Sequence, residues 1–301
     1  MEIREYLNKR NLLFAVCSVV ASLMFYEPLK DLTRFSIHSM YYSHIWLVPL
    51  VSVFFLFTER KTIFNNLDYS IRASIPVFTM SIFCYLLGRN YHVSLNQNDY
   101  VSLVTFAAIL FINGAFILCY GVRTFRAALF PLLFLIFMVP IPTFLLDRII
   151  HVLLVGSTAF TELLFKLTGA PYIREGATFH LPGISIEVAN VCSGIRSSLA
   201  LFITMVIAAH LFLKTNWKKV VLLLAIYPIT VFKNGVRIVT ISLLATYVDE
   251  RFLTHSWLHH SGGIVFFIPA LMLLGLILWA LRRNEERGTR LKDKGKTKES
   301  V

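Results

Sequence analysis

Eight apolar runs, separated by short polar segments, restrict what this chain can fold into more than any other feature of the sequence. They lie at about residues 12–27, 43–58, 72–88, 100–120, 126–143, 193–213, 219–247 and 262–282. An α-helix needs about 17 to 25 apolar residues to cross a bilayer, and its backbone polar groups are satisfied within the helix. The sequence therefore predicts an all-α integral membrane protein with about eight transmembrane helices.

The distribution of basic residues sets the orientation of these helices. Nineteen of the 29 Lys and Arg residues lie in segments 1–11, 59–72, 121–126, 214–219 and 282–301. The alternate segments hold seven: Lys30, Arg34, Arg89, Arg148, Lys166, Arg174 and Arg251. Because basic residues are enriched on the cytoplasmic side, we expect both termini in the cytoplasm and an even number of crossings. The net charge of +12 follows from this asymmetry, so no nucleic-acid partner is expected.

Residues 144–168 do not fit a ninth crossing, because an odd count would put the termini on opposite sides of the membrane. Polar side chains recur along one helical stripe of this segment: Asp147, His151, Thr158, Glu162 and Lys166. This pattern predicts an amphipathic helix at the extracytoplasmic interface. In residues 171–190, "ATFHLPGISIEV" alternates around a Pro-Gly turn, which predicts a short extracytoplasmic β-hairpin.

No soluble domain interrupts the pattern. Residues 1–281 are expected to form a single polytopic membrane domain with an active site in residues 190–265, and residues 282–301 a basic cytoplasmic tail. The four cysteines show neither metal-ligand nor disulfide spacing, so no metal site is expected. Phosphate-binding and dinucleotide-binding motifs are absent from the sequence, and no cofactor is expected.

Charged and reactive residues gather in the last third of the chain, where the topology places them at one face of the membrane. Cys192 in "NVCSGIRSS" opens the sixth span from outside, where the helix amides and dipole favour a thiolate. Arg196 lies one turn further in. The segment "KNGVRI" of the seventh span presents Lys233, Asn234 and Arg237 on one helical face.

A third segment, "LHHSGG", puts His259 and His260 at the mouth of the eighth span. A cysteine, a histidine and a buried guanidinium at one face could form an acyl-transfer site. The thiolate would attack a peptide carbonyl, an arginine would stabilise negative charge, and a histidine would transfer the proton. Because burying arginine in a membrane is costly, its default role there is functional or ion-pairing.

Other roles for these residues are open at this point. A cysteine at a helix end can be structural, and a histidine at a membrane interface can be a hydrogen-bonding anchor. Glu187 could pair with Arg196 or Arg237. Lys233 could bind a substrate carboxylate or neutralise a neighbouring acid.

The segments "EVANVCSGIRSS", "KNGVRI" and "HHSGG" resemble the three signature blocks of the exosortase and archaeosortase family of polytopic membrane cysteine transpeptidases. Upstream, "YYSHIWLVPL" and "FPLLFLIFMVPIPTFLLDRI" are similar to the second and fifth span regions of that family. The resemblance extends from about Tyr41 to Trp279, and the histidine in the third block favours the bacterial branch.

By this resemblance, Cys192 is the nucleophile, Arg237 the catalytic arginine and His259 the third catalytic residue. The residues expected to bind substrate or support the site are Arg196, Asn234, Lys233, Glu187, His260 and Ser193. The implied substrates are exported proteins with a C-terminal signal, which comprises a motif of the Pro-Glu-Pro type, one membrane span and a basic cluster. Cleavage would pass through a Cys thioester, at the periplasmic face of a bacterial inner membrane and in contact with lipid. An amine or water would accept the acyl group.

Two other functions fit the same residues. A membrane transporter would use Arg196, Lys233 and Arg237 to bind an anionic substrate. A non-catalytic factor for exopolysaccharide export would need no nucleophile. Alkylation of Cys192 as a function of pH separates the enzyme from the transporter, because an ordinary thiol titrates near a pKa of about 8.5.

Overall fold

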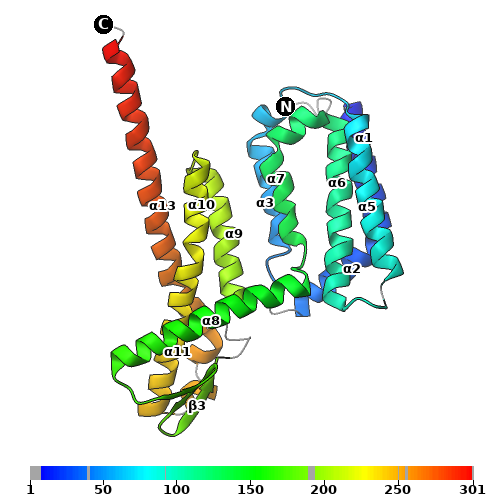
Figure 1. The fold of residues 1–301 in the computed structure, drawn as a ribbon. Helices are drawn as coiled ribbons and strands as arrows, with labels where there is room; N and C mark the ends of the chain where they lie inside the picture. The colour runs from blue at the N-terminus through cyan, green and yellow to red at the C-terminus, as the bar shows by residue number, and fades with distance from the viewer. Residues whose placement is uncertain are drawn as a thin grey trace. The chain divides into compact units, whose positions relative to one another are not determined.

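The structure is a computed structural model that describes residues 8–38, 41–91, 93–188, 194–249, 251–254 and 257–299. At residues 38, 253–254, 257–264 and 289–299 it describes the backbone alone. The chain divides into two compact units, Met1–Leu146 and Asp147–Val301. Figure 1 labels the main elements of both.

Helices are the regular secondary structure of the described residues of the first unit. Its elements are α1 (Lys9–Met24), α2 (Tyr26–His38), α3 (Leu47–Thr58), α4 (Arg60–Ile63), α5 (Ile71–Asn90), α6 (Gln97–Ala127), α7 (Leu129–Phe134) and the 3-10 helix η2 (Leu135–Met138). Helices α5 and α6 follow each other in the sequence and lie side by side (Figure 1). They form the main helix pair of this unit.

Small residues and side-chain hydrogen bonds hold α5 and α6 together. Ser81 Oγ donates to the carbonyl of Ala107, 2.7 Å away. A Cβ on Gly88 would come within 2.8 Å of a Val104 methyl group. Membrane helices associate through such close packing and hydrogen bonding, because lipid is as apolar as their side chains.

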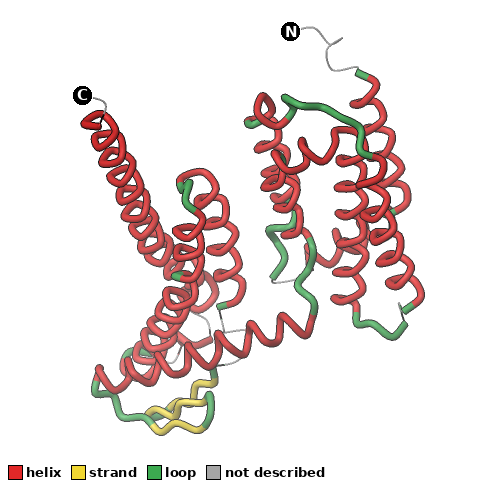
Figure 2. The backbone as a smooth tube through the Cα atoms, turned by 45° about the horizontal axis from the view of Figure 1, so that its top comes forward, coloured by secondary structure: helices red, strands yellow, loops and turns green. Residues whose placement is uncertain are grey.

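The second unit combines helices with a small sheet. Its elements are α8 (Thr143–Thr168), whose first turn belongs to the first unit, β1 (Ile173–Glu175), β2 (Thr178–Leu181), β3 (Ile184–Glu187), α9 (Ile195–Phe212), α10 (Asn216–Leu224), α11 (Ile226–Tyr247), α12 (Arg251–Thr254) and α13 (Trp257–Glu299). Within this unit, α8 runs across the direction of α9, α10 and α13 (Figures 1 and 2).

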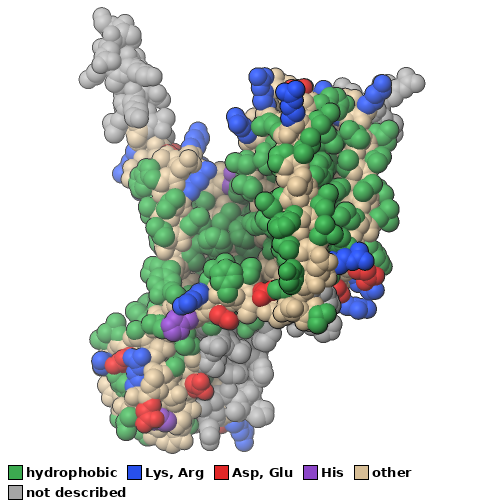
Figure 3. Space-filling view, turned by 45° about the vertical axis from the view of Figure 1, so that its right-hand side comes forward, with side chains coloured by type: hydrophobic (Ala, Val, Ile, Leu, Met, Phe, Trp, Pro, Cys, Tyr) green, Lys and Arg blue, Asp and Glu red, His purple; other side chains and the backbone are tan. Residues whose placement is uncertain are grey.

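Among the described residues, six helices are long and apolar enough to cross a membrane, and the bent pair of α1 and α2 would make seven. Hydrophobic side chains cover much of the sides of the helices, and Lys and Arg gather near helix ends (Figure 3). Two predicted spans correspond to shorter apolar helices, Leu47–Thr58 and Leu129–Met138. The first has 12 residues and extends about 18 Å, against about 30 Å of hydrocarbon. The predicted helical membrane protein is confirmed, whereas the count of eight spans is not.

The predicted helix at residues 144–168 is present as α8. By length and composition it is one of the six helices that could span a membrane. Within the second unit it runs across the direction of α9, α10 and α13, and its location at a membrane interface stays a prediction. The predicted polar stripe is not uniformly exposed: Asp147, His151 and Lys166 are exposed, but Thr158 is buried. The cause is the contact of this part of α8 with α11.

The predicted β-hairpin is also present. Strands β2 and β3 pair antiparallel, with Phe179 opposite Ile186 and a turn at Pro182 and Gly183, where φ of the glycine is 84°. Strand β1, which pairs with β2, was not predicted. Its three residues are all exposed, so they give no alternation of apolar and polar residues in the sequence. The sheet packs on α8 and α11 through a buried cluster of Phe165, Phe179, Leu181, Val188, Ile238 and Val239.

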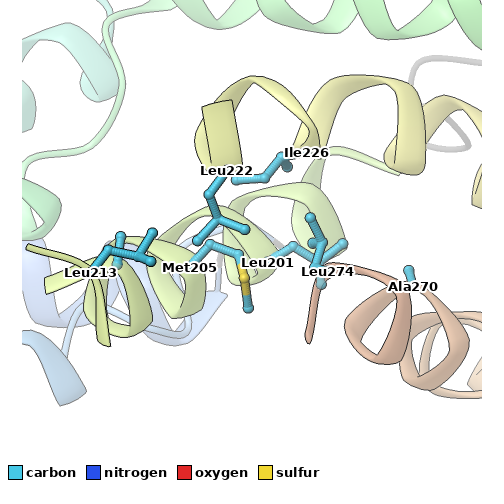
Figure 4. Packing of buried hydrophobic residues seen from close by; sticks show 8 residues of the cluster. Leu201, Met205, Leu213, Leu222, Ile226, Ala270 and Leu274 are labelled. Atoms are coloured by element: carbon cyan, nitrogen blue, oxygen red, sulfur yellow. The ribbon is translucent and has the colours of Figure 1, made fainter. Parts of the chain in front are cut away.

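A second buried cluster joins the helices of this unit. It contains Leu201, Met205, Ala209, Leu213, Leu222, Ile226, Ala270 and Leu274 (Figure 4). These residues come from α9, the following loop, α10, α11 and α13. The cluster therefore fixes the helices that carry the predicted catalytic segments.

Candidate active site

The start of α9 lies against the middle of α11. Gly194, the N-cap residue of α9, has a left-handed backbone with φ of 75°. A Cβ at this position would lie 3.3 Å from Asn234 Oδ1 and 3.6 Å from Lys233 Nζ. Two of the three sequence segments, "CSGIRSS" and "KNGVRI", therefore meet in the structure.

Hydrogen bonds fasten the turn at Gly194 to α11. Lys233 Nζ donates to Ser197 Oγ. Ser197 Oγ donates to the carbonyl of Gly194 over 2.9 Å, and Ser198 Oγ donates to the same carbonyl over 2.7 Å. Lys233 is only 6% exposed, so its ammonium lies inside the protein. Neither serine is among the predicted site residues, although both stand in the "CSGIRSS" segment.

Helix α8 reaches the same place. Asn234 is 1% exposed, and its Nδ2 donates to Ser157 Oγ of α8 over 3.0 Å. Ser157 is fully buried and is a further residue that the sequence motifs did not indicate. The predicted supporting residue Asn234 thus links α8, α11 and the turn before α9.

Glycines allow α8 and α11 to approach this closely. A Cβ on Gly156 would lie 2.7 Å from Tyr227 Oη, and a Cβ on Gly235 would lie 2.8 Å from Phe160 Cδ1. Carbon atoms in ordinary contact are about 3.5–4.0 Å apart. A larger residue at either position therefore requires a shift of the neighbouring side chain or helix.

Three buried threonines lie within four residues of Ser157 or Asn234 along the two helices. They are Thr158, Thr161 and Thr230, each no more than 2% exposed. The Oγ1 atoms of all three lack a hydrogen-bond partner within the described part of the chain. Because buried polar groups normally have partners, this polar crossing differs from a purely apolar helix contact.

The predicted arginines lie on the two segments that meet. Arg237 follows Lys233 by one turn of α11 and is half-buried. Arg196 is the second residue of α9 and is exposed. Glu187 is exposed at the end of β3 and forms no ion pair within the described ranges, so the expected pairing with either arginine is not seen there.

The remaining predicted residues are located only in part. Cys192 and Ser193 lie outside the described residues. The backbone of His259 and His260 belongs to the first turn of α13, and their side chains lie outside the description. In the structure, the "KNGVRI" segment therefore contacts the turn at Gly194, which follows Cys192 in the sequence. The mutual geometry of Cys192, Arg237 and His259 stays a prediction.

Helix α8 is also tied to the sheet by charge. Glu162 pairs with Lys166 over 2.9 Å and with Arg174 of β1. All three side chains are partly accessible, and such pairs contribute about 0–1 kcal/mol. Among the described side chains, no group of three or more His, Cys, Asp or Glu is placed to hold a metal ion.

A separate polar cluster in the first unit links the two upstream segments of the resemblance. Asp99 Oδ1 accepts from the backbone N–H of Thr143 over 2.6 Å, and Asn98 Nδ2 donates to the carbonyl of Ile141 over 2.8 Å. Tyr42 Oη donates to the same carbonyl over 3.3 Å. Burial raises the pKa of Tyr42 to about 12 and lowers the pKa of His44, both of which lie before α3. The cluster fixes the loop after η2.

The described residues define a polytopic membrane protein with a polar helix crossing buried in its second unit. A family model described as transmembrane exosortase matches residues 36–276. Because this match covers most of the chain, the protein belongs to the transmembrane exosortase family. The searches of curated proteins and of solved structures found no match. The match includes the three sequence blocks and the two upstream segments, so the resemblance is confirmed.

Proposed function

We propose that this protein is a membrane-embedded cysteine transpeptidase that cleaves the C-terminal sorting signal of exported proteins. Membership of the transmembrane exosortase family supports the reaction class. The observation that carries the proposal for this chain is the contact of Gly194, two residues after Cys192, with Lys233 and Asn234 of the "KNGVRI" segment. Segments 39 residues apart in the sequence thereby form one polar region.

In the proposed reaction, the thiolate of Cys192 attacks the carbonyl carbon of the scissile peptide. A carbon–sulfur bond forms, and Arg237 stabilises the negative oxygen of the tetrahedral intermediate. The carbon–nitrogen bond then breaks as His259 gives a proton to the leaving amine. An amine or water attacks the thioester, loses a proton to the histidine and regenerates the thiolate.

The other predicted residues have supporting roles in this proposal. Asn234 positions α8 and α11 through its bond to Ser157. Arg196 is exposed at the start of α9 and is available to a substrate. Ser193, Glu187 and His260 remain candidates for substrate contacts. The proposed location is a bacterial inner membrane, with cytoplasmic termini and the site facing the periplasm.

Substitution of the nucleophile tests the proposal. Cys192→Ala and Cys192→Ser should leave unprocessed substrate in cells that carry an exported protein with a motif, span and basic cluster at its C-terminus. The matched control is Cys84→Ala, because Cys84 is a free, buried cysteine in α5 of the first unit. Normal membrane insertion of all three variants is checked by immunoblotting. Processing that survives Cys192→Ala would show that the thioester mechanism is wrong.

A transporter for an anionic substrate is the second candidate function. It is favoured by the positive charge of Lys233, which forms no ion pair within the described ranges, and by Arg237 on the next turn. A transporter has no need for a reactive thiol at Cys192. A trapped thioester between Cys192 and a substrate would exclude this alternative as the main activity. A rate of Cys192 alkylation that rises only near pH 8.5, roughly the ordinary thiol pKa, would favour it.

A further inference from the structure

Among the described side chains of the second unit, two lysines are almost completely buried, and their surroundings differ. Lys218 of α10 is 5% exposed, and Lys233 of α11 is 6% exposed. Lys218 Nζ donates to the carbonyl of Leu281 over 3.2 Å and lies 5.6 Å from the ring centroid of Trp217. A carbonyl and an aromatic ring are common partners of a structural ammonium group.

Lys233 has a different partner. Its ammonium donates to the hydroxyl of Ser197, which carries no charge. Within the described ranges no carboxylate pairs with Lys233. Arg237, one turn further along α11, adds a second positive charge on the same side. An ammonium is costly to bury unless negative charge compensates it, so this position favours an anion that is not part of the described side chains.

The hydrogen bonds from Lys233 lead to one backbone element. Ser197 Oγ, which accepts from Lys233, donates in turn to the carbonyl of Gly194, and Gly194 has a left-handed backbone at the start of α9. Because φ of Gly194 is 75°, any residue with a Cβ is strained there, and that Cβ would also lie 3.3 Å from Asn234 Oδ1. Lys233 thus holds the start of α9 in a defined conformation, and the amides of that first turn favour negative charge beside them.

We propose that Lys233 is a positioning residue for the transpeptidase reaction: through Ser197 it fixes the turn at Gly194, and its charge favours the thiolate of Cys192. This proposal rests on the proposed function, since it assumes that Cys192 is the nucleophile. It assigns the buried lysine to the reaction rather than to neutralisation of an acid in the fold. The reacting groups are unchanged, and no additional reactant is required.

The pH dependence of Cys192 alkylation tests directly whether the charge of Lys233 favours the thiolate. In the full-length protein in detergent micelles, Cys17, Cys84 and Cys119 are replaced by alanine, and the alkylation rate of Cys192 by iodoacetamide is measured against pH. Lys233→Met should move the midpoint of this profile upward by about 1 pH unit, equivalent to about tenfold less thiolate below the midpoint. Lys233→Arg keeps the charge and should retain the profile of the parent.

The matched control is Lys218→Met, which removes a second lysine that is buried among the described side chains of the same unit. Its profile should coincide with that of the parent. An equal shift in Lys218→Met and Lys233→Met would overturn the proposal, because any buried lysine would then have the same effect. An unchanged profile in Lys233→Met would overturn it as well. A sharp gel-filtration peak for each variant ensures that the profiles report folded protein.

Ser197→Ala separates positioning from charge. It keeps the ammonium and removes the hydroxyl that links it to Gly194. Because misplacement of a reacting group slows a reaction, we expect processing of the substrate to slow about tenfold while the alkylation midpoint stays in place. Unchanged processing would refute the positioning role. The alkylation profile does not depend on substrate processing. It therefore tests the effect of Lys233 on the Cys192 thiol even if Cys192→Ala shows that the proposed function is wrong.

Discussion

The close packing of α8 on α11 at Gly235 makes a specific prediction for Gly235→Ala. The added Cβ would lie 2.8 Å from Phe160 Cδ1, about 0.7 Å closer than an ordinary carbon contact of about 3.5 Å. Either the Phe160 ring turns away or the two helices separate. The ring is already packed on Phe232, with 5.4 Å between the ring centroids, so turning it loses that contact.

Separation of the helices has its own cost. The hydrogen bond from Asn234 Nδ2 to Ser157 Oγ is 3.0 Å long, and a further 0.7 Å, roughly, would carry it beyond hydrogen-bonding distance. Overpacking costs about 1–3 kcal/mol, and a lost buried hydrogen bond costs about 1 kcal/mol more. The better helix propensity of alanine offsets about 1 kcal/mol of this cost, so we expect Gly235→Ala to lower the free energy of unfolding by about 1–3 kcal/mol.

The control is another helical glycine in the same unit. A Cβ on Gly275 in α13 would meet nothing within 4 Å. Gly275→Ala should therefore leave stability unchanged or raise it by up to about 1 kcal/mol through helix propensity. Both variants are unfolded by increasing SDS in mixed micelles and followed by circular dichroism. The expected result is an earlier transition for Gly235→Ala alone.

The same pair of variants also connects packing to activity. Because Gly235 follows Asn234 and Lys233 directly, a shift at this position should slow substrate processing as well as destabilise the protein. If the two alanine variants unfold at the same SDS fraction, the close approach of α8 and α11 is not a property of the protein. That result would remove the physical basis for the site described above.

Two further predictions concern the polar cluster of the first unit. Asp99→Ala removes the acceptor of the Thr143 N–H bond and should cost about 1.5–3 kcal/mol in the same SDS titration; a loss below about 0.5 kcal/mol would contradict the role of the cluster. Burial lowers the pKa of His44 in the folded protein. Below the unfolded value of about 6.5 the unfolded chain gains a proton first, so stability should fall as the pH drops from about 6.5 toward the folded pKa. His44→Gln should flatten this acid limb, and an identical pH profile in the two proteins would contradict the prediction.

Hydropathy predicted the long helices of this protein and overestimated the length of two short ones. The run at residues 126–143 ends as helix at Met138, because Pro140 and Pro142 remove backbone donors and bias the preceding residues toward extended structure. The run at residues 43–58 begins as α-helix only at Leu47, which leaves Pro49 in the first turn, where its missing N–H is tolerated. Counting apolar residues identifies the segments that favour a membrane, but it does not identify the residues at which their helices begin and end.

The candidate site was predictable where its residues are energetically costly to place within a membrane span. Arg237 and Lys233 stand out because cations are rare within spans. Ser157 and Ser197 do not, since a serine in an apolar helix has no periodic signature and its importance depends on what another helix brings to it. Likewise, the spacing of Glu187 and Arg196 could not decide whether they pair, because that depends on where β3 ends relative to α9.

The direction of α8 follows from the same residues that build the site. Helices α8 and α11 each contain one glycine, Gly156 and Gly235, and a Cβ on either glycine would lie within 2.8 Å of a side-chain atom of the other helix. Membrane helices that pack closely over a longer stretch often repeat small residues about every fourth position. A single glycine on each confines the close approach to a short crossing, which is what α8 makes with α11 in the second unit. The crossing in turn lets Ser157 reach Asn234, so the fold and the polar site depend on one local contact.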